Sequence, residues 1–126
     1  MAPRFEPATP GAGPLVRGFS PAGSFVVGDE AYPAILLTPE RVIPWEAPAL
    51  IELAAADVTE AIEVQPPPEF LLLGTGRRLI RPPAAFVGTL EALGIGIEAM
   101  DSRAAARTWA VLRAEERQVV AALMPL

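Results

Sequence analysis

The stretch EFLLLGTGRRLIRPP, residues 69–83, is the part of the sequence from which the fold can be inferred. It begins with an apolar run, Phe70 to Leu73, that passes into Gly74-Thr75-Gly76 and then into a basic segment. A continuous apolar run of this length is typical of a strand that is covered on both faces, as in a sheet flanked by helices. We therefore predict an α/β domain in which these residues form a central strand that ends in a sharp turn.

The residues after this turn alternate between helical and extended patterns. Phe86, Leu90 and Leu93 are spaced i, i+4, i+7, and Gly94 suits the C-terminal cap of that helix. The alternation of strands and helices indicates βαβ packing with right-handed crossovers, although the direction of the last strand stays open. In chain order the predicted elements are a helix at 83–94, a strand at 95–100, a helix from Asp101 or Ser102 to about Arg113, and a strand at 118–124.

The N-terminal half is typical of antiparallel β-structure. Short apolar runs alternate with turns between residues 15 and 45, and prolines, which cannot donate a ladder hydrogen bond, restrict these strands to short or edge positions. Asp57 and Glu60 have the spacing of a capping box and predict a helix at 57–64.

Together the two halves predict a single three-layer α/β domain over residues 15–126. Its mixed central sheet contains the βαβ units of the C-terminal half, and the N-terminal half adds an antiparallel β layer. Residues 1–14 are expected to form a flexible arm, because Pro and Gly recur there too often for a helix and little is available for burial.

The composition restricts the chemistry that the chain could perform. It has a formal net charge of −5, and its ten basic residues are all arginine, so a nucleic-acid partner is not expected. The absence of cysteine and histidine excludes disulfides, thiolate metal sites and imidazole bases. We accordingly expect no metal, no cofactor and no enzymatic activity. No apolar run approaches the roughly 20 residues of a membrane-spanning helix, and the proline-rich start is unlike a signal peptide.

The Gly-Thr-Gly turn allows two interpretations. At the C-terminal end of a strand in an α/β fold, exposed amides together with Arg77 and Arg78 could hold an anion such as a phosphate. The complete phosphate-binding signatures are absent, since the chain has no lysine for a Walker loop and Leu79 to Pro82 separate the glycines from the next helix. The other interpretation, which we prefer, is a structural turn in which Gly74 and Gly76 provide positive φ or close backbone packing.

Charged residues near the last helix form a second group of candidates. Glu98 and Asp101 lie close together in the sequence, but structural roles are commoner than a catalytic pair, so we expect a salt bridge for Glu98 and a helix cap for Asp101. Ala105, Trp109 and Leu112 are spaced i, i+4, i+7 and are expected to form the core stripe of this helix, and Arg103 and Arg107 lie on the opposite face. Beside them, Ala106, Ala110 and Ala114 form a seam of small residues. We expect Ala114 to face solvent and leave open whether another element or subunit packs against Ala106 and Ala110.

The chain resembles a known protein family in three segments, GSFVVGDEAYPAILLTPERVIPW, PEFLLLGTG and the stretch that begins GIGIEAMDSRAAARTW. This family of small bacterial, archaeal and mitochondrial proteins includes the mitochondrial NADH:ubiquinone oxidoreductase (complex I) assembly factor 3, and most of its prokaryotic members are described only as a domain of unknown function. The resemblance covers roughly residues 15–124. The chain departs from the family pattern at Ser102, where Thr is typical, and at Trp109-Ala110, where Tyr-Asn is typical.

The resemblance implies a three-layer α/β domain without established enzymatic activity. We therefore expect a non-catalytic protein-interaction or assembly-factor-like domain; the alternative is a small anion- or nucleotide-binding protein that uses the Gly-Thr-Gly loop. The expected location is the bacterial cytoplasm, with peripheral association with a membrane complex at the inner membrane left open, and the sequence does not decide the partner or the oligomeric state. The candidate ligand or interaction surface consists of Gly74, Thr75, Gly76, Arg77, Arg78, Glu98, Asp101, Arg103 and Arg107.

Overall fold

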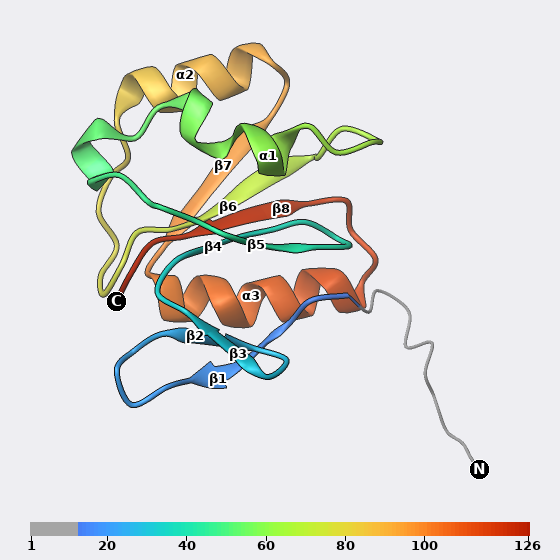
Figure 1. Cartoon of the computed structure of the whole chain (residues 1–126). Coiled ribbons are helices and arrows are strands. Elements are labelled where there is room, and N and C mark those ends of the chain that lie inside the picture. The colour runs from blue at the N-terminus through green and yellow to red at the C-terminus, as the bar shows by residue number, and fades with distance from the viewer. Residues whose placement is uncertain (1–12) are drawn as a thin grey trace.

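The computed structural model describes residues 13–126, which form two β-sheets and three α-helices (Figure 1). One sheet has three strands in the order β1-β2-β3, and the other has five in the order β5-β4-β8-β6-β7. The elements are β1 (Val16–Phe19), β2 (Phe25–Val27), β3 (Glu30–Tyr32), β4 (Ile35–Leu37), β5 (Val42–Pro44), the 3-10 helices η2 (Leu50–Glu52) and η3 (Ala55–Val58), α1 (Thr59–Ile62), β6 (Phe70–Gly74), α2 (Ala84–Ala92), β7 (Gly96–Met100), α3 (Ser102–Ala114) and β8 (Val120–Leu123).

The five-stranded sheet is mixed, as predicted. β6 lies between β7 and β8 and is parallel to both, with Leu72 opposite Glu98 on one side and Ala121 on the other. β8 is antiparallel to β4, which is antiparallel in turn to the edge strand β5. Pro44 lies in this edge strand, where a residue without an N–H is tolerated. The alternation of β6, α2, β7, α3 and β8 confirms the predicted βαβ units, and the last strand joins the parallel and antiparallel parts of the sheet.

The elements are stacked in layers (Figure 1). α1 and α2 cover one face of the five-stranded sheet, α3 covers the other face, and the three-stranded sheet packs on the far side of α3. The fully buried side chains of β6 serve both faces, since Leu71 and Leu73 pack with the α1 and α2 layer and Leu72 packs with α3. The structure therefore confirms both the doubly covered central strand and the additional antiparallel layer from the N-terminal half.

The apolar stripe of α3 holds the helix between the two sheets. Trp109 is fully buried, and its indole Nε1 donates a hydrogen bond of 2.8 Å to the carbonyl of Pro14. Ala106 is buried in the same apolar cluster as β1, so the small sheet is the element that approaches the alanine seam. The rest of the seam is less covered, with Ala110 half-buried beside β1 and Ala114 exposed as expected.

One local prediction is wrong, and one helical spacing is only partly buried. The expected capping box does not begin a helix at Asp57; its carboxylate instead accepts a hydrogen bond of 2.9 Å from the N–H of Ala54, within η3, and α1 starts only at Thr59. Leu93 has the helical spacing of Phe86 and Leu90 but does not share their burial: its exposed fraction is 62%, because α2 ends at Ala92 and Gly94, with φ of +82°, turns the chain.

Most of the arm expected at residues 1–14 lies outside the described residues, which begin at Gly13. Pro14 is half-buried at the start of the described chain, where its carbonyl accepts the hydrogen bond from Trp109. Between residues 13 and 126, no helix is long and apolar enough to cross a membrane.

Candidate functional site

The C-terminal ends of β6, β7 and β8 meet at one edge of the sheet, because these three strands are parallel. Gly74 ends β6 and leads into the Gly-Thr-Gly loop, while Met124 follows β8. β7 passes into α3 through Asp101, whose carboxylate accepts a hydrogen bond of 2.9 Å from the N–H of Ala104 and caps the helix, as predicted. The edge therefore brings together segments that are far apart in the sequence.

Ser102, which is fully buried, connects these segments. Its N–H donates to the Gly76 carbonyl at 2.7 Å, and its hydroxyl accepts from the Gly76 N–H at 2.9 Å. The same hydroxyl donates to the Met124 carbonyl at 2.8 Å, and the Met124 N–H donates to the Gly74 carbonyl at 2.9 Å. We call this set of four residues, Gly74, Gly76, Ser102 and Met124, the serine staple.

Both glycines of the loop are required, for different reasons. A Cβ atom at Gly74 would lie 2.7 Å from Ser102 Oγ and 2.9 Å from Ser102 Cα, so this position demands close backbone packing. Gly76 has φ of +105°, a backbone conformation that residues with a side chain rarely adopt. The two properties expected of the turn are thus both present, each at one glycine.

Thr75 fixes the conformation of the residues that follow the loop. It is buried, and its N–H donates to the Met100 carbonyl at 2.9 Å. Its hydroxyl donates to the Arg78 carbonyl at 2.6 Å and accepts from the N–H of Ile80 at 3.1 Å. The backbone as far as Ile80 is therefore anchored to a buried side chain.

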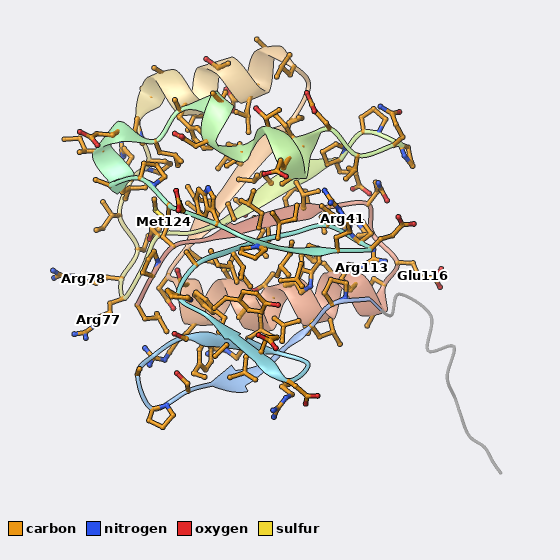
Figure 2. The ribbon with its side chains drawn as sticks, in the orientation of Figure 1. Arg41, Arg77, Arg78, Arg113, Glu116 and Met124 are labelled. Carbon is orange, nitrogen blue, oxygen red and sulfur yellow. The ribbon has the colours of Figure 1, made fainter. Side chains whose placement is uncertain are left out.

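These hydrogen bonds favour the structural turn over an anion site. An anion nest needs free amides, but the N–H groups of Thr75 and Gly76 both donate to acceptors inside the protein. The Asp101 carboxylate occupies the N-terminal end of α3, where an anion would be repelled. Arg77 and Arg78 are exposed and point away from the body of the molecule (Figure 2).

We therefore expect phosphate, sulfate and common nucleotides to leave the melting temperature unchanged. A thermal-shift series on the wild type and on Arg77→Ala/Arg78→Ala measures this directly. Because both side chains are exposed, the double substitution itself should alter stability by no more than about 0.5 kcal/mol per residue. A saturable rise of the wild-type melting temperature that disappears in the double variant would show that an anion binds at the loop.

The remaining candidate residues lie on two other parts of the surface. The guanidinium of Arg103 lies 5.3 Å from the ring centre of Phe19 in β1, and Arg107 is exposed beside the same strand. Glu98 is exposed on β7, at the edge of the five-stranded sheet. The structure thus separates the candidate set into the buried loop glycines and Thr75, the exposed arginines that follow them, and the α3 and β7 surfaces.

The main surface ion pair lies at the start of β6, opposite the Gly-Thr-Gly end. Arg117 Nη2 is 2.8 Å from Glu69 Oε1, and this hydrogen bond is the principal cause that lowers the pKa of Glu69 and raises the pKa of Arg117. Among residues 13–126, the ion pairs involve Arg117 and not Glu98, so the salt bridge expected for Glu98 is not found in that part of the chain.

The structure has an apolar pocket beside the loop that was not predicted from the sequence. It has a volume of about 380 Å³ and is formed where η2 meets the segment between β6 and α2. Ile51 is 86% exposed, Ile80 is 49% exposed and Leu79 is 62% exposed, in a segment where basic and apolar residues adjoin. We call this region the loop surface; it consists of the pocket residues Leu50, Ile51, Ile80, Arg81 and Pro83, with Arg77, Arg78 and Leu79 of the same loop.

A solved structure shows the same arrangement of elements. A Bordetella pertussis protein described as an Mth938-like domain is 33% identical in sequence, with a TM-score of 0.78, and the match covers 99% of this chain and 92% of that one. The fold of this chain is therefore Mth938-like.

The chain belongs to the protein family of unknown function DUF498/DUF598, whose family model matches residues 16–124. An uncharacterized protein of Rhodobacter capsulatus is 36% identical over 126 residues, which cover all of this chain and 94% of that protein. The NADH dehydrogenase (ubiquinone) 1 alpha subcomplex assembly factor 3 of Danio rerio is 28% identical over 114 residues, 90% of this chain and 66% of that protein. These matches confirm the family resemblance seen in the sequence, and the chain spans just under two thirds of the Danio rerio relative.

Proposed function

We propose that this protein is a non-catalytic interaction domain that assists the assembly of a multisubunit membrane complex. The observation that carries the proposal is the match along 90% of the chain to a protein that is named as an assembly factor. In this proposal the protein acts in the bacterial cytoplasm, meets the complex at the surface of the inner membrane, and uses protein contacts without a cofactor or nucleic acid.

The chemistry of the sheet edge supports a binding role over a reaction. The polar groups of Gly76 and Ser102 bond to each other, and those of Thr75 and Ser102 bond to nearby backbone groups, so they stabilise the fold and are not presented to a substrate. What the same edge does present is the loop surface, with exposed apolar side chains among arginines. Exposed apolar residues that gather in this way mark interaction sites, and arginine is enriched at protein interfaces.

Affinity capture from native membranes and, separately, from cytosol tests the proposal. The tagged full chain is the bait, an unrelated acidic protein of similar size with the same tag is the control, and retained proteins are identified by mass spectrometry. We expect subunits of one membrane complex to be enriched from the membrane fraction. In a strain that lacks the gene, partly assembled forms of that complex should accumulate on native gels. If no protein is enriched over the control, or if assembly is unchanged in the deletion strain, the proposal is wrong.

A further inference from the structure

The loop surface concentrates positive charge on an acidic protein. Arg77, Arg78 and Arg81 fall within five consecutive residues and are all exposed, although the chain carries a net charge of −5. Two segments, residues 50–52 and 77–83, form the surface, and together they contain one carboxylate, that of Glu52. The local charge is therefore opposite in sign to the charge of the whole molecule.

The same surface exposes apolar side chains around a pocket. Ile51 is 86% exposed in η2, and Ile80 lines the pocket from the opposite segment. Ile51 thus has most of its surface in contact with water and Ile80 has about half, and covering them would stabilise a complex in proportion to the apolar area removed. A pocket of about 380 Å³ has room for an inserted apolar side chain.

The surface is held in shape before any partner binds. The Thr75 hydroxyl bonds to the Arg78 carbonyl and the Ile80 N–H, and the serine staple ties the preceding glycines to α3 and β8. A segment that is already ordered loses less conformational entropy on association, so binding costs less. The hydrogen bonds that favour a structural turn over an anion site thus also keep the loop surface ordered for docking.

On this basis we infer that the loop surface binds an acidic segment of a partner protein, in which an apolar side chain that enters the pocket is flanked by carboxylates. The inference rests on the proposed interaction function and names the chemistry of the partner. Arginine guanidinium groups bind carboxylates through paired hydrogen bonds. The arginines of the loop surface are therefore expected to select an acidic partner segment. A concave site favours an inserted side chain over a lipid surface, which offers no side chain to insert.

A fluorescein-labelled peptide, Asp-Asp-Leu-Phe-Asp-Asp, tests the inference by fluorescence anisotropy with the full chain. Binding should weaken about tenfold for Arg77→Gln/Arg78→Gln and for Ile51→Ser, because each removes one of the two attractions. Matched controls are Arg17→Gln/Arg41→Gln, which remove the same charge from exposed arginines elsewhere, and Leu93→Ser, which truncates an exposed apolar residue away from the loop. These controls should change the affinity less than about twofold.

Several outcomes would overturn the inference. These are the absence of peptide binding, equal weakening by test and control variants, and wild-type binding to vesicles of equal parts phosphatidylcholine and phosphatidylglycerol without binding to the peptide. Affinity capture with the Arg77→Gln/Arg78→Gln bait separates the inference from the proposed function. A partner retained equally by wild type and variant leaves the assembly proposal intact and refutes the docking site, whereas peptide binding without any captured partner refutes the assembly proposal.

Discussion

Replacement of Gly74 with alanine is expected to destabilise the protein by about 3 kcal/mol. The new Cβ atom would lie 2.7 Å from Ser102 Oγ, 2.9 Å from Ser102 Cα and 3.0 Å from Leu123 Cδ2, all closer than or at the limit of real contacts. Ser102 cannot rotate away without losing its hydrogen bonds to Gly76 and Met124, so the backbone of α3 or β6 has to shift. Urea denaturation measures the loss, which should also lower the melting temperature by roughly 10 °C or more.

Gly88 provides a matched control for this substitution. It lies in α2 and is exposed, and a Cβ atom there would meet no other atom within 4 Å. Alanine at Gly88 should stabilise the helix by about 0.5–1 kcal/mol, because alanine loses less backbone entropy than glycine on folding. The two Gly→Ala substitutions are therefore expected to have opposite signs, and a Gly74→Ala variant as stable as the wild type would contradict the close packing of the loop on α3.

The close packing at Gly74 was only partly predictable from the sequence. The Gly-Thr-Gly pattern indicated a turn, but not its partner, because Gly76 and Ser102 are 26 residues apart and β7 lies between them. The sequence placed the start of the helix at Asp101 or Ser102 and favoured Asp101 as its cap, with no role for the Ser102 hydroxyl in the loop. In the structure Asp101 caps α3, which leaves the neighbouring hydroxyl free to face the loop.

The parts of the fold that were predictable have strong local patterns. Burial could be predicted from local sequence for the apolar run of β6, for Phe86 and Leu90 with their helical spacing, and for Trp109 in the apolar stripe of α3, and all of these core side chains are buried except that of Phe70. η2, η3 and α1 have three or four residues each, too short to show a period, and their conformation depends on packing. The direction of β8 depends on pairing with β6 and β4, which no local pattern encodes.

The loop surface escaped prediction for a related reason. An isoleucine is usually buried, yet Ile51 is 86% exposed. It forms one surface with Ile80 only because η2 lies next to the loop after β6 in the fold. Residues 50 and 80 lie 30 positions apart in the sequence. The cluster of three arginines around Leu79 and Ile80 at 77–81 was visible in the sequence, but its position beside a pocket was not.

Replacement of Ser102 with alanine is expected to destabilise the protein by about 2–3 kcal/mol. The substitution removes one hydroxyl but leaves two groups without their partner, the Gly76 N–H and the Met124 carbonyl. Because Ser102 is fully buried, water cannot replace these hydrogen bonds without opening the sheet edge. Urea denaturation measures the loss, and amide hydrogen exchange should show faster exchange at Gly76.

Asp101→Ala is the matched control, because it removes a neighbouring side chain that makes one hydrogen bond and is only half-buried. Loss of this N-cap should cost about 1 kcal/mol and leave exchange at Gly76 unchanged. If Ser102→Ala costs no more than Asp101→Ala, the serine staple does not hold the loop. If it costs more, as expected, the same variant should also bind the acidic peptide less tightly, since the arginines that follow Gly76 would lose their fixed backbone.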